Sequence, residues 1–250
     1  MRRFGLTGFP LSHSFSAKYF SDKFAKQKIT DCEYLNFPAR EVSEIRSLFE
    51  RDHLLCGLNV TIPHKKAILD ILDIVEPTAS SIGAVNVIKA FRKETTLTLK
   101  GFNTDIFGFR ESLPKDISER GGVAIVLGSG GAASSVIHAL QTMDFKIMVV
   151  SRSGNKGTIS YKDLEATILR KASLIVNTTP LGMFPDIQKL PEINYEQLTE
   201  STFLYDLIYN PAITRFMSEG IERGCRVMNG LKMLELQAEK SWEIWNDDSF

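Results

Sequence analysis

The amino-acid sequence predicts an α/β fold in which two α/β domains flank a cleft. Short apolar runs alternate with segments of helical period along the chain, as in strands joined by helices. The apolar run 123–127 enters a glycine cluster and then a helix-forming segment at 132–143. The strand and helix pattern restarts after residue 105. We therefore expect one domain from residues 1–104 plus 231–250 and a second from residues 105–230, with a small-molecule site in the cleft.

The composition is that of an ordinary globular protein and excludes several classes of function. Lys plus Arg and Asp plus Glu number 30 each, so no overall charge favours nucleic acid or a membrane surface. The three cysteines have neither metal-ligand spacing nor an even disulfide framework. No signal peptide or membrane-spanning run is seen. We expect a cytoplasmic protein with reduced thiols and no metal.

The first domain is expected to hold several strands, a hairpin and helices between them. The predicted strands are 3–8, 33–37 and 55–60. The segment 80–88 is predicted as a turn leading into a strand, which pairs with 95–100 as a hairpin. The predicted helices are 17–28, 42–50 and one after residue 66.

Polar residues gather at the ends of three of these elements. Ser14 and Ser16 belong to a hydroxyl-rich turn, where Ser16 suits a helix N-cap and the hydroxyls equally suit a polyhydroxylated ligand. Lys65 follows strand 55–60 at a helix start, where the helix dipole disfavours cations. That placement indicates function, and a solvated surface lysine is the alternative. Asp105 either caps the next helix or lines a cleft.

The glycine turn of the second domain predicts a dinucleotide site. Gly128, Gly130 and Ala133 fit the pattern G-x-G-x-x-G/A between an apolar strand and a helix. The first glycine makes the tight turn, and the second lets the backbone approach a pyrophosphate. The helix N-terminus then offers free N–H groups and the positive end of its dipole to the phosphates.

The end of the following strand, 146–150, favours NADP over NAD. An NAD site usually places a carboxylate there for the ribose 2′-hydroxyl. Here Ser151, Arg152, Ser153 and Lys156 supply two cations and two hydroxyls, which suit a 2′-phosphate. A solvated basic turn is the alternative.

The remaining predicted elements complete a parallel sheet. They are helices 163–170 and 212–223, strands 173–176, 202–206 and 225–228, and a closing helix to about residue 246. Gln237 lies on an otherwise packing-type face of the closing helix and is a candidate ligand contact.

Eight polar motifs in order make the sequence resemble the shikimate dehydrogenase family over nearly its whole length. They are G-x-P-x-x-H-S-x-S at 8–16, N-V-T-I-P-x-K at 59–65, G-A-V-N at 83–86, N-T-D at 103–105, G-S-G-G-A at 128–132, N-T-T-P-x-G-M at 177–183, D-x-x-Y-N-P at 206–211 and G-x-x-M-L-x-x-Q at 230–237.

The resemblance implies reduction of 3-dehydroshikimate to shikimate with NADPH, in aromatic amino-acid biosynthesis. It implies that Lys65 and Asp105 form a catalytic pair. The implied substrate contacts are Ser14, Ser16, Thr61, Asn86, Tyr209 and Gln237, with the two serines on the carboxylate. The implied cofactor contacts are Gly128, Ser129, Gly130, Gly131, Ala132, Ser151, Arg152, Ser153, Lys156, Leu207 and Gly230.

The sequence departs from the family pattern at a few positions. Ala17 stands where the family usually has proline, and Lys156 at best replaces a second arginine, which predicts weaker NADP selectivity. The alternatives are a quinate/shikimate dehydrogenase and a non-catalytic NADP-binding regulatory domain. The expected partner is a small-molecule substrate, and the protein is expected to be a monomer or homodimer.

Overall fold

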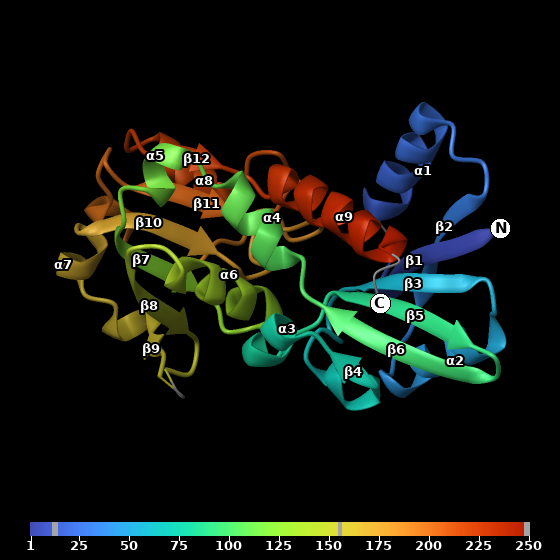
Figure 1. Cartoon of the computed structure of the whole chain (residues 1–250). Helices are drawn as coiled ribbons and strands as arrows, with labels where there is room; N and C mark the ends of the chain where they lie inside the picture. Colours follow the sequence, from blue (N-terminus) through green and yellow to red (C-terminus); the bar gives the residue numbers. More distant parts are fainter. Residues whose placement is uncertain (12–14, 155–156, 248–250) are drawn as a thin grey trace. The chain divides into compact units, whose positions relative to one another are not determined.

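The computed structural model describes residues 1–11, 15–154 and 157–247 (Figure 1). The chain divides into two compact units. Unit 1 contains Met1–Thr104 and returns from Ala238 onward, whereas unit 2 is Asp105–Gln237. The chain returns from unit 2 to unit 1 inside helix α9 (Leu231–Asn246), so this one helix contributes to both units.

Unit 1 is built on a mixed sheet with the strand order β2-β1-β3-β5-β6-β4. Strand β1 is parallel to β2 and β3, while β5 is antiparallel to β3 and β6. Its strands are β1 (Arg2–Gly8), β2 (Cys32–Pro38), β3 (Leu55–Val60), β4 (Ile74–Val75), β5 (Val87–Lys93) and β6 (Thr96–Phe102). Its helices are α1 (Phe15–Gln27), α2 (Ser43–Arg51), the 3₁₀ turn η1 (Ala67–Ile71) and α3 (Pro77–Ile82).

Separate hydrophobic clusters cover the two faces of this sheet (Figure 1). Helix α1 and the end of α9 pack on one face, where the rings of Phe4 and Trp245 stack with centroids 4.9 Å apart. The Trp245 indole also donates a hydrogen bond to the carbonyl of Ile88. Helix α2 packs on the other face through Ile45 and Phe49. The polar strand ends described below are held by this double-sided core.

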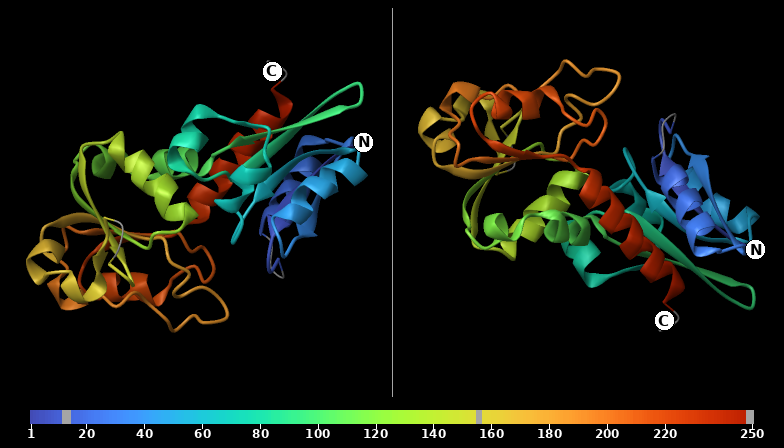
Figure 2. Two further views of the ribbon diagram at one scale, coloured as in Figure 1. Left: turned by 90° about the horizontal axis from the view of Figure 1, so that it is seen from below. Right: turned by 90° about the horizontal axis from the view of Figure 1, so that it is seen from above.

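Unit 2 is built on a sheet with the strand order β12-β11-β10-β7-β8-β9, in which each neighbouring pair of strands is parallel. Figure 2 shows helices on both of its faces. Its strands are β7 (Gly122–Leu127), β8 (Phe145–Ser151), β9 (Ile159–Ser160), β10 (Ala172–Asn177), β11 (Phe203–Asp206) and β12 (Arg226–Met228). Its helices are α4 (Asp105–Ser112), α5 (Lys115–Ser118), α6 (Gly131–Gln141), η2 (Tyr161–Asp163), α7 (Ala166–Leu169), η3 (Tyr195–Gln197) and α8 (Arg215–Ile221), together with the start of α9.

The α/β fold and the hairpin of β5 with β6 confirm the prediction, but three local predictions were wrong. The helix expected after residue 66 is only the five-residue η1, because β4 begins at Ile74. The helix expected at 163–170 is divided, because Leu164 is extended between η2 and α7. The turn expected from residue 80 is part of α3, which Glu76 caps and Gly83 ends with φ +68°.

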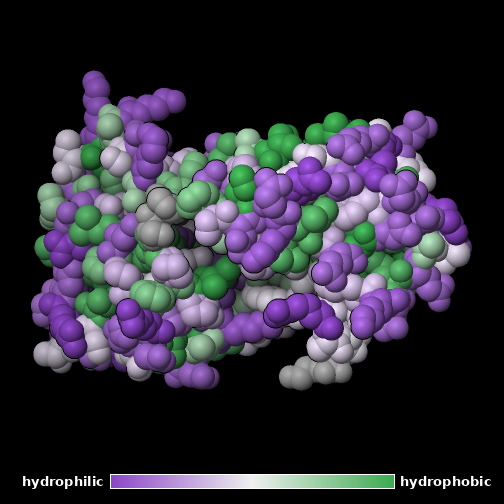
Figure 3. Space-filling view, turned by 180° about the vertical axis from the view of Figure 1, so that it is seen from behind, coloured by the Kyte–Doolittle hydropathy of each residue, from purple (hydrophilic) through white to green (hydrophobic). Residues whose placement is uncertain are grey.

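Exposed hydrophobic side chains are interspersed with hydrophilic ones on the face seen in Figure 3. Within the described ranges, no helix has both the length and the apolar character needed to cross a bilayer.

Candidate functional site

The polar strand end of unit 1 brings together three of the predicted site residues. Thr61 follows β3 and donates its backbone N–H to the carbonyl of Thr7, 2.9 Å away at the end of β1. The carbonyl of Lys65 accepts the N–H of Val85 at 2.8 Å. Asn86 comes next, and its carbonyl accepts the N–H of Val60 at 2.8 Å. Thr61, Lys65 and Asn86 therefore lie where β1, β3 and β5 meet.

Asn86 also fixes the segment that precedes Asp105. Its amide nitrogen donates to Thr104 Oγ1 at 3.0 Å, and its amide oxygen accepts the backbone N–H of Thr104 at 2.7 Å. Both residues are buried, with 2% and 1% of their surface exposed. In a dry core such a two-point contact holds the backbone firmly.

Ser16 lies in the first turn of α1 and is buried. Its hydroxyl is hydrogen-bonded to the phenol of Tyr34 on β2. Ser14, the other predicted carboxylate contact, lies outside the described residues.

In unit 2, Asp105 and Gln237 lie at one helix–helix contact. Asp105 is the buried first residue of α4. One turn later Gly108 lets α9 approach closely, because a Cβ there would stand 2.7 Å from the carbonyl oxygen of Met233 and 3.0 Å from Gln237 Cβ. Residues i and i+3 share a helix face, so Asp105 lies one turn along α4 from the contact of Gly108 with Gln237. The Gln237 amide donates to the carbonyl of Leu234 at 2.9 Å.

The glycine turn combines a backbone of positive φ with an open helix N-cap. Gly128 has φ +113°, and a Cβ there would lie 2.6 Å from Thr178 Oγ1. Gly130 is the N-cap of α6 without a side-chain cap, and a Cβ there would meet no atom within 4 Å. The first N–H groups of a helix have no partner within it. Gly131, Ala132 and Ala133 are the first residues of α6 and follow Ser129 and the open position at Gly130.

The segment after β8 holds the predicted 2′-phosphate contacts. Ser151 is buried, shares a 2.6 Å hydrogen bond with Thr158 and accepts the N–H of Gly154. Its side chain therefore shapes the turn. Arg152 and Ser153 are exposed, and the charge of Arg152 acts on the half-buried Tyr161. Lys156 lies outside the described residues.

Leu207 and Gly230 come together after β11 and β12. A Cβ on Gly230 would stand 2.0 Å from the Leu207 carbonyl oxygen, and the Gly230 N–H donates to Ile208 at 3.0 Å. The third residue from this region, Tyr209, is half-buried. Only glycine fits such a close backbone approach.

A buried carboxylate beneath these loops was missed from the sequence. Asp206 pairs in register with Asn177, whose amide donates to it at 3.1 Å. It also accepts the Thr214 hydroxyl at 2.6 Å and the Ile208 N–H at 3.0 Å. Burial nevertheless raises its pKa to about 6, since desolvation outweighs these three donors. The sequence could have predicted this pair, because Asn177 and Asp206 end neighbouring parallel strands and each belongs to one of the eight motifs.

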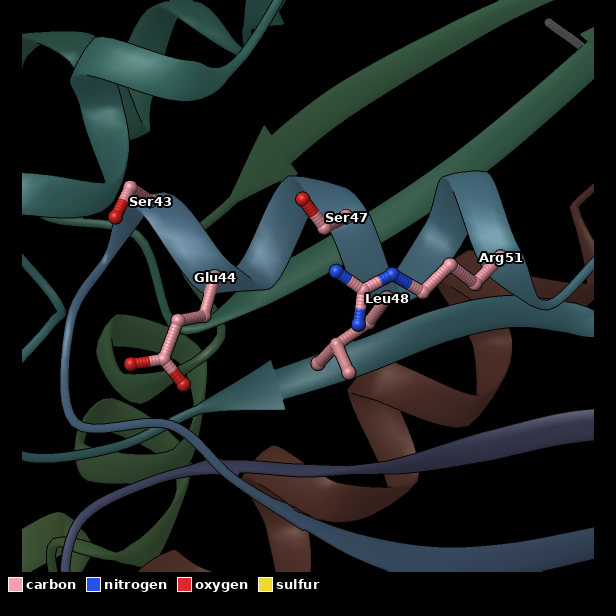
Figure 4. Close-up of a pocket in the computed structure, with 5 residues that line it drawn as sticks. All are labelled: Ser43, Glu44, Ser47, Leu48 and Arg51. Carbon is pink, nitrogen blue, oxygen red and sulfur yellow. The ribbon is translucent and has the colours of Figure 1, made fainter.

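A surface pocket elsewhere in unit 1 contains none of the predicted site residues. Figure 4 shows its lining residues, all from α2: Ser43, Glu44, Ser47, Leu48 and Arg51.

The parallel sheet, the glycine turn and the open helix N-terminus define the class of protein. The chain is a two-unit α/β protein whose second unit is of the Rossmann dinucleotide-binding type.

Comparisons with known proteins identify the family. The model of the shikimate dehydrogenase substrate binding domain matches residues 6–88. A shikimate dehydrogenase (NADP+) from Clostridium beijerinckii is 38% identical, over 99% of this chain and 93% of the relative. The structure of a Thermus thermophilus shikimate 5-dehydrogenase in complex with NADP(H) and shikimate matches with a TM-score of 0.86 and 31% identity, covering 98% and 94% of the two chains. The chain belongs to the shikimate dehydrogenase family.

Proposed function

We propose that the chain catalyses the reversible, NADPH-dependent reduction of 3-dehydroshikimate to shikimate. The family membership supports this reaction. The observation that carries the proposal is the presence of both half-sites in one chain: the polar strand end with Thr61, Lys65 and Asn86 in unit 1, and the glycine turn in unit 2. Unit 1 is then the substrate domain and unit 2 the NADP domain.

Shikimate has a carboxylate and ring hydroxyls, and the proposed contacts match these groups. Ser14 and Ser16 donate to the carboxylate. The ring hydroxyls are held by four residues with amide, hydroxyl or phenol groups: Thr61, Asn86, Tyr209 and Gln237. The exchange of hydrogen bonds between Asn86 and Thr104 supports this assignment, because it orients the Asn86 amide in advance of binding.

Lys65 and Asp105 form the proposed catalytic pair. Reduction of the substrate ketone leaves an alkoxide that must take up a proton. A lysine ammonium within hydrogen-bond reach of that oxygen polarises the carbonyl and supplies the proton. The Asp105 carboxylate orients the ammonium. NADPH, when bound, supplies the hydride.

The residues of unit 2 fit NADP. The proposed pyrophosphate contacts are the backbone groups of Gly128, Ser129, Gly130, Gly131 and Ala132, and the open space at Gly130 supports them. Arg152 and Ser153 are exposed where a 2′-phosphate would be recognised, with Ser151 and Lys156 as the other proposed contacts. Leu207 and Gly230 are proposed to contact the cofactor from the ends of β11 and β12.

Quinate dehydrogenase activity is the second candidate. A quinate dehydrogenase from Corynebacterium glutamicum has a TM-score of 0.80 but only 22% identity, which shows the fold alone. The turn Ser151-Arg152-Ser153 lacks the carboxylate that NAD sites usually carry, which favours the shikimate and NADP assignment. A non-catalytic regulatory domain usually lacks the lysine or the aspartate, and this chain has both.

One assay separates these functions. Oxidation is followed at the nicotinamide absorbance with four pairs: NADP or NAD, each with shikimate or quinate. We expect the highest kcat/KM for NADP with shikimate. A higher value for NAD with quinate would assign the second function, and no turnover with any pair would support a regulatory domain.

Location and assembly complete the proposal. All three cysteines are free, which supports a reducing, cytoplasmic compartment. A monomer or homodimer remains the expected assembly.

A further inference from the structure

A chain of buried polar side chains runs through the core of unit 1. None of its members exposes more than 8% of its surface. Two apolar clusters make up most of the surrounding core, together with a few other buried polar side chains such as Thr7 and His64. The members, from α1, β2, β3, α9 and the segments before β5 and α4, are Ser16, Tyr34, Asn59, Ser241, Asn86 and Thr104.

Asn59 lies in the middle of this network. Its amide oxygen accepts the Tyr34 hydroxyl at 2.8 Å, and its amide nitrogen donates to Ser241 Oγ at 2.9 Å. The Ser241 and Thr104 hydroxyls share a contact of 3.3 Å, and Asn86 donates to Thr104. Continuous hydrogen bonds thus connect β2 with the segment that leads to Asp105.

Ser16 is attached to the other end through Tyr34. Burial raises the pKa of the Tyr34 phenol, so the phenol keeps its single proton and directs it to Asn59. The phenol oxygen is left to accept the Ser16 hydroxyl. This arrangement fixes the position of Ser16 Oγ before a carboxylate binds.

Polar side chains in a dry core are costly unless every group is paired, and here they are linked end to end. We propose that Tyr34, Asn59 and Ser241 are positioning residues that set the distance between the carboxylate contact Ser16 and the hydroxyl contact Asn86. The proposal rests on the proposed function, since it takes both contacts from it. In this role Tyr34, Asn59 and Ser241 act through Ser16 and Asn86, to which hydrogen bonds connect them.

Tyr34→Phe is the direct test, because it removes one hydroxyl and keeps the ring that stacks on Phe20, with centroids 4.4 Å apart. We expect the KM for shikimate to rise about three- to tenfold, as for the loss of one hydrogen bond, with an unchanged KM for NADP. In a Ser16→Ala background the same substitution should change the KM less than about twofold, because residues that act as a unit are non-additive.

Tyr205→Phe is the matched control. Tyr205 is also buried, stacks on Phe109 and bonds to Ser112 through its hydroxyl at 2.6 Å, but in unit 2. It should lower the urea midpoint about as much as Tyr34→Phe and leave the KM for shikimate unchanged. Ser241→Ala breaks the same network at a second point and should also raise this KM, which keeps the test valid if Tyr34→Phe folds poorly.

Two results would overturn the inference while leaving the proposed function in place. One is a normal KM for shikimate in Tyr34→Phe or Ser241→Ala while Ser16→Ala raises it. The other is an effect of Tyr34→Phe that persists undiminished in the Ser16→Ala background. A normal KM in Ser16→Ala itself would overturn both this inference and the assignment of Ser16 as a substrate contact.

Discussion

The two units hold their candidate half-sites by different means. In unit 1 two candidate residues are fixed through side chains, since Asn86 is hydrogen-bonded to Thr104 and Ser16 to Tyr34. In unit 2 the candidate residues are fixed by backbone geometry, since Gly128 has φ +113° and Gly230 lies against the Leu207 carbonyl. A phosphate can be held by the backbone N–H groups that every residue except proline carries, whereas a carbohydrate-like ring needs particular side chains at set distances.

The largest effect is expected for substitution of Lys65, the proposed proton donor. Lys65→Met keeps roughly the length of the side chain and removes its charge and donors. We expect kcat to fall about 10²–10⁴-fold, as for a lost proton donor, with little change in the KM for NADP.

Asp105→Asn should also be severely impaired. If the two residues act as a pair, the double variant should lose less than the product of the single losses. Steady-state kinetics of the four enzymes measures this. A near-normal kcat in Lys65→Met would return this residue to a solvated surface lysine.

Alanine substitutions at two glycines of unit 2 distinguish a glycine needed for folding, Gly230, from a glycine needed for cofactor binding, Gly130. Gly230→Ala places a methyl 2.0 Å from the Leu207 carbonyl oxygen and should cost about 1–3 kcal/mol or more. Gly130→Ala places it in open space, so it should cost less than about 1 kcal/mol yet raise the KM for NADP. Urea unfolding and cofactor kinetics read the two effects. Equal losses of stability would contradict the distinction.

Asp206 gives unit 2 a pH dependence that its glycines do not. Burial raises its pKa from 3.8 to about 6, so the folded state holds the proton to a higher pH than the unfolded state. Its stabilising contribution is complete below pH 3.8 and is lost as the pH rises to about 6, which corresponds to roughly 3 kcal/mol.

Asp206→Asn removes this titration. The unfolding free energy of the original protein minus that of the variant should therefore fall by roughly 2 kcal/mol between pH 4 and pH 7. A difference that stays constant over this range would show that the carboxyl group titrates normally.

The most selective expected effect is confined to one cofactor. Arg152→Ala should raise the KM for NADP about ten- to a hundredfold, since a charge-assisted contact is worth roughly 1.5–3 kcal/mol. The KM for NAD should barely change. Arg110→Ala, at an exposed arginine paired with Glu111, is the control for loss of a surface charge. Equal loss with both cofactors would end the assignment of Arg152 to the 2′-phosphate.

The parts that the sequence predicts are those with a local cause. The apolar run before Gly128 and the helix-forming run after it predict the turn between β7 and α6 to within a few residues. Lys65 and Asp105 were singled out only by their polar surroundings at strand ends and by resemblance. Asn59, Tyr34 and Ser241 were not predicted as a network, because they are up to 207 positions apart and only the sheet and α9 bring them together.

Helix α9 imposes an order on biosynthesis. Residues 105–237 are complete before the chain has supplied Ser241 and Trp245, whereas the core of unit 1 contains both. During synthesis on the ribosome, unit 2 can therefore fold before unit 1 is complete. Until α9 is made, the strands of unit 1 have an apolar face that α9 does not yet cover. A chaperone that shields Phe4 and Phe20 during that interval would protect the protein at its most aggregation-prone stage.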